Sequence, residues 1–155
     1  MTRRDELIAA LMFASREYST AAVMFHNAVA QRFGLSVSDL KTLDILQRRG
    51  ALTAGEIAVH TSLATASVTS LIDRLQKKGL VRRARDPGDR RRVVVKLTPK
   101  LEETIAPLFK SLNRRMLARF KSYSDGDVAL IRDFLTESAD EMRAEAGRLP
   151  KGSGE

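Results

Sequence analysis

Residues 64–98 decide the fold of this chain, and they read ATASVTSLIDRLQKKGLVRRARDPGDRRRVVVKLT. In the first half of the stretch, apolar residues recur at spacings typical of one helical face: Val68, Leu71, Ile72 and Leu75. Gly79 favours an end to that helix, and β-type runs follow at residues 80–85 and 92–97. The residues between the two runs include Pro87 and Gly88, as a turn does. The stretch therefore predicts a helix followed by a two-stranded hairpin.

Positive charge is concentrated in the same stretch. Residues 74–92 hold nine Lys or Arg and two Asp, a balance of +7 within a chain total of +8. Residues 124–155 hold four basic and eight acidic side chains, so the basic surface is central in the sequence and not a terminal tail. A helix with a small polar face beside a basic hairpin is typical of proteins that bind duplex DNA.

Composition excludes several other kinds of protein. The 155 residues are 43% hydrophobic, which favours one packed domain or two closely joined lobes. The chain has no cysteine and two histidines, so we expect no disulfide, no metal site and no cofactor. No apolar run is long enough to span a membrane, and we expect a cytoplasmic protein. Because no phosphate-binding glycine loop, metal-ligand cluster or nucleophile motif is present, we do not expect an enzyme.

Helices are predicted on both sides of the central stretch. The first runs from about Asp5 to Arg32, and one helical face of it is apolar: Leu7, Leu11, Tyr18, Ala22, Phe25 and Val29. Ser36 and Asp39 predict the start of a helix to about Arg49, and Thr53 and Glu56 form a capping box for a short third helix. The helix after it has an unclear start, because Ala64 occupies the cap position and Ser62 or Thr65 must serve instead.

After the hairpin, Thr98 and Pro99 predict the cap and first residue of a helix to about Ser122, and Ser124 predicts the cap of a last helix. Both carry apolar faces that extend to Leu149, and residues 150–155 are expected to form a loose tail. The fold class is therefore mainly α with a small β-hairpin, a winged helix-turn-helix between long amphipathic helices.

In the order of its predicted elements and in three of its segments, the chain resembles the MarR family of bacterial transcriptional regulators. The resemblance rests on three segments in order: residues 71–81, the wing-like residues 86–92, and Val95-Lys96-Leu97-Thr98. It implies a homodimer with N- and C-terminal dimerisation helices (residues 5–34 and 99–149) around a DNA-binding domain (residues 36–98). Each subunit would place a recognition helix in the major groove and a wing in the minor groove of a pseudo-palindromic double-stranded operator.

The resemblance also implies roles for individual residues. In the recognition helix the groove-facing set is Thr65, Ala66, Ser67, Thr69, Ser70 and Arg74. In the wing, Arg90 is the tip arginine, Asp89 and Arg91 are the pair that holds the turn, and Arg92 is a further contact. Many relatives carry a longer side chain where this chain has Ser70, so water-mediated contacts or DNA shape would supply part of the specificity.

Four more cations are interpreted as phosphate contacts, which give affinity without reading sequence: Lys77, Lys78, Arg82 and Arg83. Alternatively, they form a solvated charged surface. Members of the family often bind a small aromatic or phenolic effector, and the residues placed for such a pocket are Tyr18, Phe25, His26 and Leu43. The alternative is that these four belong to the core. We expect a repressor released by an effector; an architectural DNA-binding protein with little sequence preference is the other hypothesis.

Overall fold

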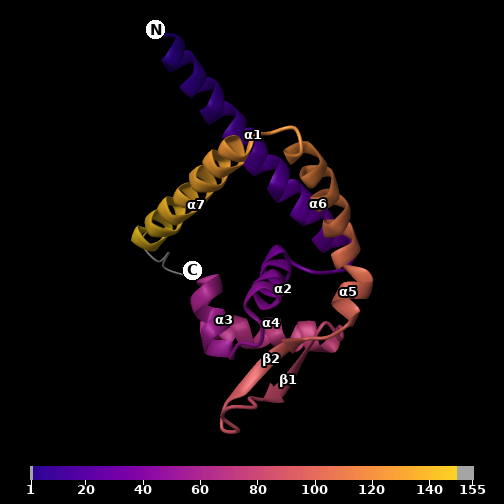
Figure 1. The fold of residues 1–155 in the computed structure, drawn as a ribbon. Helices are drawn as coiled ribbons and strands as arrows, with labels where there is room; N and C mark the ends of the chain where they lie inside the picture. The colour runs from indigo at the N-terminus through magenta and orange to yellow at the C-terminus, as the bar shows by residue number, and fades with distance from the viewer. Residues whose placement is uncertain (1, 150–155) are drawn as a thin grey trace. The chain divides into compact units, whose positions relative to one another are not determined.

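The structure is a computed structural model that describes residues 2–149, and the chain divides into two compact units between Leu108 and Phe109. Its elements in chain order are α1 (Arg3–Arg32), α2 (Val37–Arg49), α3 (Ala54–Thr61), α4 (Thr65–Lys77), β1 (Val81–Arg85), β2 (Val93–Leu97), α5 (Lys100–Thr104), α6 (Ala106–Phe120) and α7 (Asp125–Arg148) (Figure 1). This order confirms the predicted fold class. The predicted tail, residues 150–155, lies outside the described residues.

Short-range capping fixes where most helices begin. α2, α3 and α7 start at the predicted capping boxes, in which a hydroxyl accepts an N–H bond and a carboxylate three residues on accepts one in return. Thr2 and Asp5 form a further box at α1. For α4, Ala64 is the N-cap, at the position that the sequence indicated. The expectation that Ser62 or Thr65 replaces it is wrong, because Ser62 is the left-handed C-cap of α3 and the α4 cap makes no side-chain bond.

The helix predicted from Thr98 to Ser122 is interrupted, and its cap was also predicted wrongly. Pro99 is the N-cap of α5, and the Thr98 hydroxyl instead donates to the Gly79 carbonyl at 2.6 Å. The helix breaks at Ile105, between α5 and α6. Pro107 explains this break, because it has no N–H to donate to the carbonyl of Glu103 and its ring crowds the preceding turn.

The core of the first unit lies around α4. Val68, Leu71, Ile72 and Leu75 are all at most 2% exposed, which confirms the predicted buried face. They belong to a core that also holds residues of α2, α3 and both strands: Leu40, Leu43, Leu46, Ile57, Val81, Val94 and Val95. Burying one such side chain stabilises the fold by roughly 1.5–3 kcal/mol, so α4 has a fixed position.

The hairpin is attached to the same core. β1 and β2 pair antiparallel, from Val81 opposite Leu97 to Arg85 opposite Val93. Leu52 extends the pairing by exchanging two backbone hydrogen bonds with Val95, at 3.2 and 2.7 Å. In Figure 1 the hairpin projects away from α2, α3 and α4 and ends in the turn of residues 86–92.

The terminal helices leave most of their apolar side chains uncovered within one chain. In α1, burial is confined to Val29 and Ala30, while Leu7 is 63% and Phe13 66% exposed. α7 has no buried residue in its whole length. The apolar face predicted for the first helix is thus present, but the chain itself covers only its C-terminal end.

Candidate nucleic-acid interface

In the first half of α4, the side opposite the core carries short side chains. Thr65, Ala66, Ser67, Thr69 and Ser70 are all exposed. The Thr69 hydroxyl donates to the Thr65 carbonyl at 3.2 Å, and the Ser70 hydroxyl donates to the Ala66 carbonyl at 3.3 Å. Both distances are long for O–H···O bonds, so the hydroxyls can exchange these partners for others. Short side chains allow the helix backbone to approach another surface closely.

The N-terminus of α4 differs from those of α1, α2, α3 and α7, which all begin with a capping box. Its cap makes no side-chain hydrogen bond, and its first turn holds no acidic residue. The first N–H groups of the helix therefore carry the positive end of the helix dipole without a carboxylate to neutralise it. An exposed end of this kind favours an anion such as phosphate.

Arg74 is bonded to a buried carboxylate on α2. Its Nε donates to Oδ2 of Asp39 at 3.1 Å, and its Nη2 donates to Oδ1 at 2.7 Å. The Asp39 side chain is fully buried, whereas the Arg74 side chain is 45% exposed. Burial raises the pKa of Asp39, but hydrogen bonds from Arg74 and Ser36 and the Arg74 charge outweigh it and lower the pKa below 3.8. The sequence indicated Asp39 only as a cap residue.

The turn of the hairpin is held by two aspartates. Asp86 accepts the Gly88 N–H at 2.8 Å, and Asp89 accepts the Arg91 N–H at 3.0 Å. Asp89 and Arg91 are in contact, but through the Arg91 backbone N–H and not through its guanidinium, so their role in holding the wing stays a prediction. Because an aspartate that accepts an N–H two residues on fixes a turn locally, the guanidinium remains outside it.

Arg92 connects the hairpin to α3. Its Nη2 lies 2.9 Å from Oε1 of Glu56, and its Nη1 lies 3.9 Å from Oδ2 of Asp86. Glu56 also accepts the N–H and hydroxyl of Thr53, and these two bonds, with smaller contributions from Arg92, lower its pKa. Arg92, which we expected at the DNA, thus fixes the base of the wing relative to α3.

The remaining predicted cations fall into two groups. The side chains of the first group have partners within the chain: Arg83 pairs with Asp73 at 2.7 Å, and Lys78 donates to the Phe33 carbonyl at 3.0 Å. The Lys78 carbonyl in turn accepts a bond from Lys100 at 2.8 Å. The other group makes no hydrogen bond or ion pair through its side chains to any residue that the structure describes: Lys77, Arg82, Arg90 and Arg91. Their charges are exposed to solvent and available to a polyanion.

The four residues predicted for an effector pocket have different surroundings. Leu43 is in the core at 2% exposure, whereas Tyr18 is 64% exposed. Nδ1 of His26 lies 2.6 Å from the Ala22 carbonyl and Nε2 lies 3.4 Å from Nζ of Lys41. The Phe25 ring contacts the His26 ring edge-on at 5.8 Å. Their role in effector binding stays a prediction.

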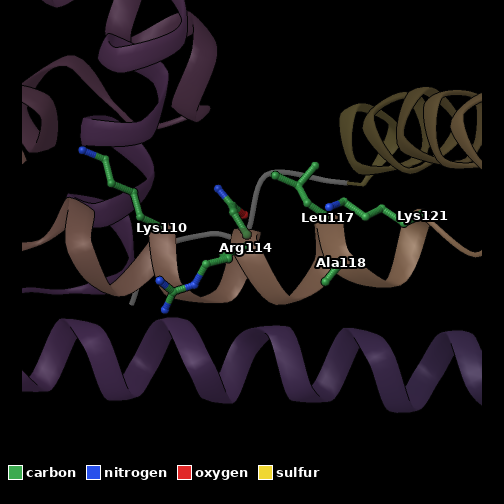
Figure 2. A pocket seen from close by; sticks show the side chains of 6 residues that line it. Lys110, Arg114, Leu117, Ala118 and Lys121 are labelled. Carbon is green, nitrogen blue, oxygen red and sulfur yellow. The ribbon is translucent and has the colours of Figure 1, made fainter.

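A groove is present elsewhere, on α6 in the second unit (Figure 2). Its volume is about 490 Å³, and it is lined by Lys110, Asn113, Arg114, Leu117, Ala118 and Lys121. None of the predicted effector residues lines it. Within residues 2–149 no group of three or more His, Asp or Glu is arranged to hold a metal ion, and no helix is long and apolar enough to cross a membrane.

Known proteins have similar sequences. The MarR family model matches residues 35–93, from the start of α2 to the start of β2. The HTH-type transcriptional regulator YcgE of Bacillus subtilis is 41% identical over 146 residues, which cover 94% of this chain and 95% of YcgE. The chain belongs to the MarR family. The MarR-family regulator is also similar to YsmB of Bacillus subtilis, with 30% identity over 74% of this chain and 79% of that protein.

The fold agrees with solved members of the MarR family. The structure of a MarR family protein from Bacillus stearothermophilus superposes with a TM-score of 0.67 at 25% identity, over 92% of this chain and 99% of that one. The resemblance drawn from residues 71–81 and 86–92 is thereby confirmed, and the protein is a winged helix-turn-helix transcriptional regulator.

Proposed function

We propose that this MarR-family regulator is a homodimeric repressor that binds a pseudo-palindromic double-stranded operator. The proposal rests on the short, exposed side chains in the first half of α4. Beside them is a hairpin tip at which the guanidinium groups of Arg90 and Arg91 have no intramolecular partner among the described residues. A helix with small side chains fits the major groove closely, and arginine gains from the negative potential of a narrow minor groove.

In this proposal α4 reads base edges and the wing reads the adjacent minor groove. Thr65, Ala66, Ser67, Thr69 and Ser70 face the bases, the free N-terminus of α4 faces a phosphate, and Arg90 enters the minor groove. Lys77 and Arg82 contact phosphates, which fixes the register of the protein without selecting sequence.

Dimerisation is supported by the apolar surface that one chain leaves uncovered. Leu130 is 70% and Met142 71% exposed on α7, and Met24 is 67% exposed on α1. Large apolar side chains exposed along a helix are typical of an interface, and soluble homo-oligomers are most often two-fold dimers. A two-fold dimer presents two recognition helices to two half-sites, which must lie about 34–36 Å apart.

Repression follows from occupancy of a promoter, since a bound dimer blocks access to the DNA it covers. Release by an effector requires only that the effector favours a spacing of the two recognition helices that does not fit the operator. We propose a small aromatic or phenolic compound as that effector, with Tyr18, Phe25, His26 and Leu43 as its contacts, and a cytoplasmic location for the protein.

The test is selection of bound sequences from a random duplex pool at near-physiological salt. A two-fold-symmetric motif of about 16–20 base pairs supports a dimeric operator reader. Enrichment of A·T-rich DNA without a symmetric motif contradicts the proposal and favours the architectural alternative, in which specific and non-specific affinities are nearly equal. Ser67→Ala is expected to change the preferred bases more than it changes binding to random DNA.

A further inference from the structure

Asp39 and Arg74 form the most complete polar contact on the recognition helix. The buried carboxylate accepts two bonds from the guanidinium, at 3.1 and 2.7 Å, and one from the Ser36 N–H at 2.8 Å. This is the side-on, two-bond arrangement in which an arginine is held most firmly by a carboxylate. The partners lie 35 residues apart in the sequence, on α4 and α2.

Arg74 is also the residue best suited to read guanine from this helix. It follows Ser70 by four residues and Ser67 by seven, so it lies on their side of α4. The residues in front of it carry hydroxyls or a methyl group, whose base preference is weak. A guanidinium, by contrast, pairs through two bonds with O6 and N7 of guanine, the commonest specific contact in the major groove.

We infer that Asp39 withholds the guanidinium of Arg74 from the DNA, so that α4 reads its half-site through short side chains alone. The inference rests on the proposed function, because it concerns how the operator is read. Leaving Asp39 for guanine would strip a fully buried carboxylate of both guanidinium bonds, and one base contact does no more than offset that loss. Asp39 is therefore a positioning residue: it decides the operator sequence without touching DNA.

The experiment compares the selected motifs of the full-length wild type, Asp39→Asn, Arg74→Met and the double variant. Asp39→Asn keeps the shape of the side chain but removes the charge that holds Arg74. We expect this variant to gain a guanine at one position in each half-site and to bind the guanine-containing operator at least about tenfold more tightly than the wild type does. Arg74→Met is expected to keep the wild-type motif, and the double variant to lose the added guanine.

Ser36→Ala is the matched control, because it loosens the same capping box while leaving the Asp39–Arg74 pair in place. It is expected to lower thermal stability without adding a guanine. A purely structural role for Asp39 would change stability in the same way and leave the motif alone. Circular dichroism establishes which variants are folded. If Arg74→Met is not folded, Arg74→Lys takes its place, because it keeps a cation beside Asp39 but cannot pair side-on with guanine.

Two results overturn the inference. In the first, Arg74→Met or Arg74→Lys removes a base preference that the wild type has, which means that Arg74 reads DNA while bound to Asp39. In the second, folded Asp39→Asn selects the wild-type motif unchanged. Failure of the proposed function is a different result, in which the wild type itself selects no symmetric motif.

Discussion

The salt dependence of DNA binding can be estimated from the basic side chains that no intramolecular bond holds in place. Of the nine Lys and Arg between residues 74 and 92, three are paired with carboxylates and two are bonded to backbone carbonyls. The other four are Lys77, Arg82, Arg90 and Arg91. If these contact phosphates, a dimer neutralises eight, and the slope of log K against log salt is about −7. Affinity should then fall about 10⁴-fold between 50 and 200 mM salt.

Single substitutions measure how much each basic residue contributes to that slope. Arg90→Gln removes two charges per dimer and should change the slope from about −7 to about −5. Arg83→Gln is the matched control, because the Arg83 charge is already paired with Asp73 at 2.7 Å, and its slope should stay near that of the wild type. Asp73→Asn releases Arg83 and should make the slope steeper, at about −9.

The assay is fluorescence anisotropy with one labelled operator at five or more salt concentrations, under conditions where each variant is dimeric. If Arg83→Gln and Arg90→Gln change the slope equally, the Arg83–Asp73 ion pair must open when the protein binds DNA. The slope then could not be predicted from the number of unpaired basic side chains. A wild-type slope shallower than about −3 would refute the assignment of these cations to phosphate contacts.

Three further outcomes are expected. Because the pKa of Asp39 is lowered on folding, its stabilisation is fully present above about pH 3.8 and is lost progressively as pH falls through the folded value. Asp39→Asn should therefore cost about 2–3 kcal/mol at pH 7, less than a fully buried pair because Arg74 is half exposed. Urea unfolding should show this cost decreasing progressively as pH falls below about 3.8. Ala64→Asp should stabilise α4 by about 0.5–2 kcal/mol, yet weaken DNA binding because its carboxylate repels phosphate. Ala64→Ser should stabilise α4 without that repulsion. Equal DNA affinities for the two variants would contradict a phosphate at this helix end. Phe134 and Leu135 are adjacent, exposed apolar residues of α7. The double variant Phe134→Glu, Leu135→Glu should be monomeric by light scattering, and a dimer of unchanged mass would exclude this part of α7 from the interface.

Features set by neighbouring residues were predicted from the sequence. The caps at Ser36, Thr53 and Ser124 each depend on a hydroxyl and a carboxylate three residues apart, and all three are present. Gly79 ends α4 with a φ of +73°, a conformation that glycine adopts without a steric penalty. The hairpin followed from its β-branched run and its turn residues.

Features set by distant residues were not predicted. Arg74, Arg83 and Arg92 all looked like free cations, yet each is bonded to a carboxylate on another element. Thr98 has the sequence of a cap but donates to a carbonyl 19 residues earlier. Counting charged residues in the sequence predicts the net charge of this surface. It does not predict which side chains form ion pairs, because that depends on how distant elements pack together.

The carboxyl end of the recognition helix is attached to its surroundings by three short bonds. Lys78 donates to the last turn of α1, Lys100 at the start of α5 donates to the Lys78 carbonyl, and Thr98 donates to Gly79. A tilt of α1 or α5 therefore has to carry this end of α4 with it or break these bonds. Since α4 is embedded in a rigid core, it turns as a whole. Strain applied at either neighbouring helix is transmitted mechanically to the face of α4 that we propose for the major groove.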